Sequence, residues 1–176
     1  AVALAHVVKY ADRRLDGVEG VMASDSTVLL EVQTLGDQGL RYRHRLRRDV
    51  SRWIHLEAVP APRLTDTCGA GDWCTAGLIA KTAVGGRKGF RAAGARGARA
   101  ALRYGQVLAA WNCGFEGARG GMYTVARQAF KQQISGLLNG QFDGIPDAPV
   151  VSTLTPTVSC PACPRAIPEL GQAEGG

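Results

Sequence analysis

Four short apolar runs in the first third of the chain are followed by longer segments with helical periodicity. This order of elements restricts the fold more than any other feature of the sequence. Runs typical of β-strands occupy residues 4–8, 28–32, 40–46 and 53–59. The pattern turns helical over residues 72–83, over 90–111 as one or two helices, and over 123–138. Strands followed by helices predict a layered α/β domain.

Glycines mark the ends of several of these elements. Residues 36–39 predict a tight turn between two strands, and Gly85 with Gly86 ends the first helix. Asn139 and Gly140 end the last one, and the polar residues 12–15 are compatible with a short helix. From residue 141 onward, prolines and small polar residues predict a loose tail. We therefore divide the chain into a domain at 1–140 and a tail at 141–176.

Length and composition fit an ordinary globular domain, with 176 residues of which 45% are hydrophobic and 20% charged. No apolar run approaches the roughly 18 residues that span a bilayer, which argues against a membrane protein. The chain begins at Ala1 without an initiator methionine, so we expect it to be cut from a longer protein. Five cysteines at irregular spacing do not form a disulfide framework, and a reducing, cytoplasmic setting is expected.

Cys160 and Cys163 form a CxxC pair in the tail, a pattern that can bind zinc or carry out redox chemistry. Zinc needs four ligands, and the three histidines, His6, His44 and His55, lie far upstream. An incidental pair is the favoured interpretation. Half of a zinc site completed by other sequence, and thioredoxin-like chemistry, are the alternatives.

The net charge of +6 arises from two basic clusters. The first follows residues 41–52 and alternates with apolar residues, as expected of a strand with one solvated face. The second follows residues 87–103 and lacks the interleaved aromatic residues of a single-strand binder. For both basic clusters, the favoured interpretation is a charged surface that faces solvent. Nucleic-acid binding is a weaker alternative, and strongly salt-dependent binding would be its sign.

The sequence DTCGAGD at residues 66–72 carries the clearest chemical signal. Gly69, Ala70 and Gly71 let a ligand approach the backbone closely, and their amides would be the unpaired donors of a helix start. The helix macrodipole adds partial positive charge there, so the main chain alone would form an anion site. Asp72 could then take a proton from an attacking hydroxyl while these amides hold a phosphoryl group. The alternative is a structural glycine turn in which Asp72 caps the helix.

Residues 66–72 resemble the DTxGAGD signature of the PfkB/ribokinase family of carbohydrate kinases, which includes ribokinase, fructokinases and adenosine kinase. Three further segments resemble family segments in the same order. Residues 5–9 resemble the strand before the family's lysine–asparagine turn, residues 34–39 its TxGxxG nucleotide-binding turn, and residues 109–118 its C-terminal helix and Gly-Ala loop. The likeness covers roughly residues 4–140. It implies a ribokinase-like three-layer α/β/α domain that lacks its N-terminal part and lid.

The resemblance implies a role for each matching residue. Asp72 would be the catalytic base, and Gly69, Ala70 and Gly71 the anion hole. The residues implied to lie near the nucleotide are Thr34, Gly36, Gly39 and, by a loose match to the adenine contact, Gln106. Those implied to face a potassium-type ion are Asp66 and the carbonyls of Cys68 and Gly117. ATP, Mg²⁺ on the nucleotide and K⁺ nearby are the implied cofactors.

The implied function is ATP-dependent phosphorylation of a hydroxyl on a sugar or sugar-like small molecule, with dimerisation through the absent lid. Ala11 and Arg14 depart from the family because they stand at its Asn-x-x-Glu positions, which organise Mg²⁺ and phosphates. Trp73 and Cys74 follow the base where other residues are common, and Cys74 is interpreted as a packing residue. A nucleotide-binding regulatory module without phosphotransfer is therefore the alternative function.

Overall fold

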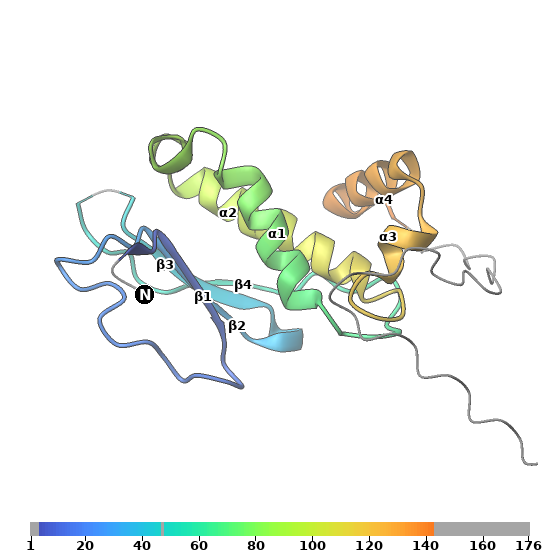
Figure 1. The fold of residues 1–176 in the computed structure, drawn as a ribbon, viewed down its shortest axis with the longest axis horizontal. Helices are drawn as coiled ribbons and strands as arrows, with labels where there is room; N and C mark the ends of the chain where they lie inside the picture. The colour runs from blue at the N-terminus through green and yellow to red at the C-terminus, as the bar shows by residue number, and fades with distance from the viewer. Residues whose placement is uncertain (1–3, 47, 143–176) are drawn as a thin grey trace, which may run out of the picture. The chain divides into compact units, whose positions relative to one another are not determined.

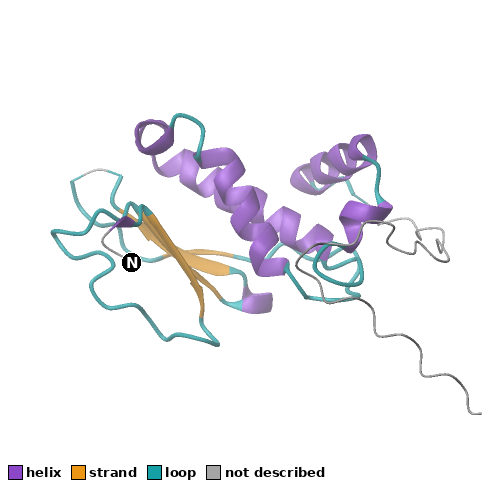
Figure 2. Cartoon of the chain, in the orientation of Figure 1, coloured by secondary structure: helices purple, strands orange, loops and turns teal. Residues whose placement is uncertain are grey.

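The computed structural model describes residues 4–46 and 48–142 of the chain. Four strands form one sheet, with helices packed on one of its faces (Figures 1 and 2). The strands are β1 (Val7–Ala11), β2 (Leu30–Thr34), β3 (Leu40–His44) and β4 (Ile54–Leu56). A short 3-10 helix, η2 (Gly36–Gln38), joins β2 to β3. The helices are α1 (Ala70–Thr82), α2 (Gly86–Asn112), α3 (Gly120–Thr124) and α4 (Arg127–Asn139).

The sheet has the strand order β1-β2-β3-β4. β1 and β2 are parallel, whereas β3 pairs antiparallel with both β2 and β4. The predicted tight turn at residues 36–39 is confirmed, since the Leu35 amide donates to the Gly39 carbonyl at 2.8 Å. Gly39 has a φ of 92°, and a Cβ there would lie 2.2 Å from the Leu56 carbonyl oxygen. Only glycine fits this position because both the backbone conformation and the space exclude a side chain.

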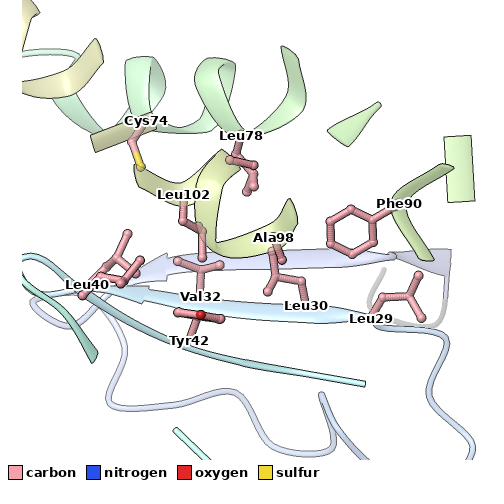
Figure 3. Close-up of a cluster of buried hydrophobic side chains, with 12 residues drawn as sticks. Leu29, Leu30, Val32, Leu40, Tyr42, Cys74, Leu78, Phe90, Ala98 and Leu102 are labelled. Atoms are coloured by element: carbon pink, nitrogen blue, oxygen red, sulfur yellow. The ribbon is translucent and has the colours of Figure 1, made fainter. Parts of the chain in front are cut away.

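Alternating residues of the strands place an apolar face of the sheet beneath α1 and α2 (Figure 3). Val32 and Tyr42 are directly opposite each other in the β2–β3 pair and are both buried. Leu78 of α1 and Leu102 of α2 pack onto them as part of the same cluster. Each fully buried leucine of this kind contributes about 1.5–3 kcal/mol to folding. This core fixes the start of α1 above the sheet.

The predicted α/β class is confirmed, and two of the three expected layers lie within the described residues. Helices cover one face of the sheet, whereas the connection from β1 to β2, residues 12–29, runs without a helix. Parallel strands are usually joined through a helix, so this crossover is unusual. Residues 12–15, whose sequence is compatible with a short helix, form a turn in which the amides of Arg14 and Leu15 both donate to the Ala11 carbonyl.

Several predicted boundaries shift. β1 begins at Val7 rather than at Leu4, whose side chain is 87% exposed. The helix expected over residues 123–138 is two helices, because Val125 and Ala126 adopt extended backbone angles between α3 and α4. The interpretation of residues 90–111 as one or two helices is confirmed, since α2 breaks at Gly94, with φ 65° and ψ −166°.

A second core joins the C-terminal half of α2 to α4. Trp111 lies 4.8 Å from Phe130 and 4.7 Å from Phe115 between ring centroids. The Trp111 indole also donates to the Gln133 side chain at 2.7 Å. Gly121 passes against this ring so closely that a Cβ would lie 2.3 Å from it. No helix among the described residues is long and apolar enough to cross a membrane.

Candidate functional site at the N-terminus of helix α1

The glycine-rich element folds as a loop that leads directly into α1. The helix begins at Ala70, two residues before the predicted start, and Gly69 precedes it with a left-handed φ of 76°. Asp72 therefore lies in the first helical turn, where it is exposed. A carboxylate in this turn is favourably placed with respect to the helix dipole.

The amides at this helix start are only partly engaged. The Ala70 amide donates to the Thr67 carbonyl at 3.2 Å, and the Trp73 amide donates to the Gly69 carbonyl at 2.9 Å. The amides of Gly69, Gly71 and Asp72 have no acceptor among the described residues. Of the three predicted anion-hole amides, two are thus free to bind a ligand and one is used within the loop. The Asp72 amide, which was not predicted, is a third free donor.

Asp66 holds two distant segments of the chain together. Its carboxylate accepts from the Cys68 amide and from the Gly117 amide, each at 2.9 Å. These two backbone donors lower the pKa of Asp66 because they stabilise the ionised form. The loop containing Gly117 also approaches the helix start, since a Cβ on Gly69 would lie 2.7 Å from that of Ala118. Asp66 and Gly117, both implied by the resemblance to face an alkali ion, are therefore adjacent.

The residues expected to face an alkali ion, Asp66, Cys68 and Gly117, are in contact with one another, and their oxygens already accept hydrogen bonds. The Cys68 carbonyl accepts from Asn112 Nδ2 at 3.1 Å. Asn112 is completely buried, and its Oδ1 has no partner among the described residues. Carboxylate, carbonyl and amide oxygens are the hard ligands that alkali ions prefer, so the donor set fits K⁺. Groups of three or more His, Cys, Asp or Glu side chains that could hold a metal are absent from the described ranges.

Lys9 is a neighbour of the helix start that was not among the predicted site residues. Its Nζ donates to the Gly71 carbonyl at 3.1 Å, and no other acceptor for it is found in residues 4–46 and 48–142. Two of the three ammonium protons are therefore available beside the free amides. Lys9 lies opposite Val32 in the sheet and so points to the helix-covered side. From the sequence alone, only the alternation of side chains along a strand could have indicated the side of the sheet to which Lys9 points.

The predicted nucleotide-binding residues lie around β2 and β4. Thr34 ends β2 opposite Ala11, and Gly36 and Gly39 belong to the turn that follows. Gln106 is buried under β4, where its Nε2 donates to the carbonyls of Leu56 and Glu57 at 3.4 and 3.1 Å. Its Oε1 has no partner within the described part of the chain.

A hollow of about 640 Å³ opens beside this turn. The residues that line it are Asp37, Gln38, His55, Glu57, Ala58 and Pro60. His55 Nε2 lies 2.9 Å from the Gln38 carbonyl, which links β4 to the turn. The lining residues were not predicted, because four of them belong to β4 and the segment after it and become neighbours of the turn only on folding.

The remaining predictions have mixed outcomes. Cys74 is buried in the main core, which confirms its interpretation as a packing residue, and burial raises the pKa of its thiol. Ala11 and Arg14 lie at and just after the end of β1, and the Arg14 side chain is exposed. All six basic residues of the second cluster are exposed on or beside α2, as expected of a solvated face. Cys160 and Cys163 lie outside the described residues.

Comparisons with known proteins identify the fold. No protein-family model matches the sequence, and a search of curated proteins found no match. Among solved structures, a nucleoside kinase from Burkholderia thailandensis in complex with inosine is similar, with 21% identity and a TM-score of 0.54. A protein described as ribokinase II from E. coli, in its apo form, has 19% identity and a TM-score of 0.55.

These similarities extend over most of this chain but over less than half of either neighbour. They cover 78% and 79% of this chain, and 42% and 41% of the two neighbours. The chain thus has part of a ribokinase-like α/β fold.

Proposed function

We propose that this chain is the nucleotide-handling part of a kinase that transfers a phosphoryl group from ATP to a hydroxyl of a sugar-like or nucleoside-like molecule. The observation that carries the proposal is the start of α1. There, the unpaired amides of Gly71 and Asp72 lie beside the Asp72 carboxylate and the Lys9 ammonium. An anion-binding corner next to an exposed carboxylate suits phosphoryl transfer, which requires positioning and charge stabilisation more than covalent chemistry.

Each group at this corner has a separate task in the proposed reaction. The amides of Gly69, Gly71 and Asp72 donate to the oxygens of the transferring group, where negative charge must be stabilised. The Lys9 ammonium uses its two free protons on the same group while the Gly71 carbonyl fixes its position. The Asp72 carboxylate accepts the proton of the attacking hydroxyl. The bond from the γ-phosphorus to ADP breaks as the bond to the acceptor oxygen forms.

The hollow beside η2 is the proposed position of the nucleotide's ribose and base. The side chains of Asp37, Gln38 and Glu57 offer hydrogen-bond acceptors, which suit ribose hydroxyls and an exocyclic amine rather than phosphates. Gly36 and Gly39 flank two of the lining residues, Asp37 and Gln38, along the chain, and Thr34 ends β2 just before this turn. In the proposal these three residues would guide the phosphates toward α1. Gln106 stays an indirect candidate, since its amide nitrogen supports the backbone of β4.

The cofactors are part of the proposal. Mg²⁺ would be held by the nucleotide's own oxygens, since the position expected to supply a carboxylate is Arg14. K⁺ would be held by oxygens of Asp66, Cys68 and Gly117, with the free Oδ1 of Asn112 close by. These ions would supply positive charge near the phosphates when bound.

A test compares the protein with its Asp72→Asn variant in two measurements. Calorimetry with MgATP and K⁺ is expected to show similar binding, because the amides that hold the phosphates remain. Phosphoryl transfer to a panel of sugars and nucleosides is expected to fall by about 10²–10⁴-fold, the usual contribution of a general base. Equal transfer by both proteins would exclude Asp72 as the base, and failure of both to bind MgATP would reject the nucleotide site.

The second candidate function is a regulatory module that binds nucleotide without turning it over. Arg14 favours it, because a cation replaces the carboxylate that would organise Mg²⁺. MgATP binding with no transfer to any acceptor in the panel would support this function over the kinase.

A further inference from the structure

Trp73, the residue after Asp72, connects the start of α1 to the loop of residues 114–118. Its indole Nε1 donates to the Ala118 carbonyl at 2.8 Å, although the two residues are 45 positions apart in the sequence. Its backbone amide donates to the Gly69 carbonyl at 2.9 Å and closes the first turn of the helix. Ala118 in turn lies against Gly69, since a Cβ on Gly69 would be 2.7 Å from that of Ala118. These three residues therefore form a closed ring of contacts.

The two ends of the 114–118 loop are held by different contacts. At its beginning, the Gly114 carbonyl accepts hydrogen bonds from two side chains of the segment just before Asp66. Its other end is tied to the glycine-rich segment by two hydrogen bonds among the described residues, from the Gly117 amide to Asp66 and from the Trp73 indole to Ala118. The indole thus supplies one of the two attachments of this end.

Aromatic neighbours from two other helices fix the orientation of the Trp73 side chain. Trp111 of α2 meets it edge-on at 5.5 Å between ring centroids, and Phe130 of α4 lies at 6.3 Å. Because these contacts restrict the ring, its N–H group is held in place for the Ala118 carbonyl.

The alternative is that Trp73 serves only as a packing residue of the second core, with which it is in contact. Packing requires the ring alone, and a phenylalanine would also fill the space between Trp111 and Phe130. The hydrogen bond to Ala118 is an additional feature, because it joins the ring to the loop rather than to the core. A substitution that keeps the ring and removes the N–H therefore separates the two roles.

We propose that Trp73 is a positioning residue, whose indole N–H holds the 114–118 loop against the helix start and so keeps the Gly69 amide directed at the transferring phosphoryl group. Gly69 precedes α1 with a left-handed φ of 76°, and its amide has no acceptor among the described residues. Ala118 and Trp73 contact this glycine from separate segments and restrict it to that conformation. The effect on phosphoryl transfer rests on the proposed function, whereas the attachment of the loop does not.

Hydrogen exchange followed by NMR tests the attachment without requiring activity. In the unsubstituted protein, the Trp73 indole proton and the Gly117 amide proton should be similarly protected, because the same opening of the loop exposes both. In Trp73→Phe, the Gly117 amide is expected to exchange roughly two- to tenfold faster, as for the loss of one hydrogen bond. Gln133→Met is the matched control, because it removes the acceptor of the Trp111 indole in the same aromatic cluster and should leave Gly117 unchanged.

Unequal protection of the two protons in the unsubstituted protein would overturn the attachment. Unchanged exchange of Gly117 in Trp73→Phe, or equal acceleration in Gln133→Met, would also overturn it. The first of these measurements needs no substitution, so it decides the question even if Trp73→Phe does not fold.

Steady-state kinetics test the consequence for the reaction. In Trp73→Phe, kcat is expected to fall by roughly tenfold to hundredfold, since small displacements of a positioned group are costly in rate. The KM for MgATP should change little, because the Gly69 amide acts mainly on the charge that develops in the transition state. Equal kcat in Trp73→Phe and Gln133→Met would overturn the positioning role. Absence of transfer in the unsubstituted protein would instead reject the proposed kinase function, and the exchange data would still decide whether the indole holds the loop.

Discussion

Gly77 of α1 and Gly105 of α2 are in direct contact, and a Cβ on Gly77 would lie 2.6 Å from the Cα of Gly105. The same α2 glycine faces the Cys74 carbonyl, 2.5 Å from where its own Cβ would be. The two helices can approach this closely only because neither glycine carries a side chain. Their contact sets the position of α1, and with it the position of Asp72 and the free amides.

Gly77→Ala is therefore expected to destabilise the protein by about 1–3 kcal/mol, the usual cost of overpacking a tight contact. The atoms that would have to move belong to backbone, which yields less than a side chain. Urea unfolding followed by circular dichroism measures the change. Gly17→Ala is the control, because nothing lies within 4 Å of a Cβ there. Equal stability of the two variants would show that α1 and α2 can separate without cost.

Lys9→Met is expected to weaken MgATP binding by roughly tenfold or more, because a hydrogen-bonded charge beside the phosphates is lost. The substitution keeps much of the apolar stem on the helix-covered side of the sheet and removes the ammonium. Calorimetry on the protein and on Lys88→Met, which changes an exposed lysine of α2, provides the comparison. If the Lys9→Met variant binds MgATP as tightly as the protein does, Lys9 has only a structural role, through its hydrogen bond to the Gly71 carbonyl.

Asp66→Asn is expected to lower stability near neutral pH and to matter less in acid. The pKa of Asp66 is held below its ordinary value of 3.8 by the amides of Cys68 and Gly117. A depressed pKa gives stability that is present above the unfolded value and is lost as pH falls through the folded one. Urea unfolding at pH 6 and pH 3 should show the difference between protein and variant narrowing at the lower pH. The exposed Asp25→Asn should show no such trend.

Arg43→Met is expected to destabilise the protein by about 3 kcal/mol, since it leaves the buried Glu31 carboxylate without its cation. The double variant with Glu31→Gln should recover much of this loss, because no charge then stays buried. A double-mutant cycle measured by urea unfolding gives the coupling between the two side chains. Additive effects would mean that the Tyr10 hydroxyl, rather than Arg43, stabilises the carboxylate.

Local features of the fold could be predicted from the sequence where the signal itself is local. The turn at Gly36 and Gly39, the alternation that separates Tyr42 from Arg43, and the end of α4 at Gly140 all follow from neighbouring residues. The helix at 123–138 was predicted as continuous because its periodicity runs on. Its interruption at Val125 accompanies the packing of Gly121 on Trp111, a contact between separate segments.

The candidate site was predicted in part for the same reason. The helix start at residues 69–72 follows from its glycines, and the anion binding that we propose for it follows from the free amides. The hydrogen bond from Lys9 to Gly71 spans 62 positions, and that from Gly117 to Asp66 spans 51. Only the assembled sheet and helices bring such partners together. Local sequence patterns do not show which residues so far apart along the chain come into contact.

The left-handed Gly94 in α2 divides that helix into two segments with different burial. Amide protons after the break belong to a segment buried through Ala98, Leu102 and Val107, and they can exchange with solvent only when the core opens. Those before it are anchored chiefly by Phe90, which is 4% exposed. The first turns of α2 can therefore open and close on their own, at a lower free energy than the rest, while α1 and its glycine-rich start stay in place.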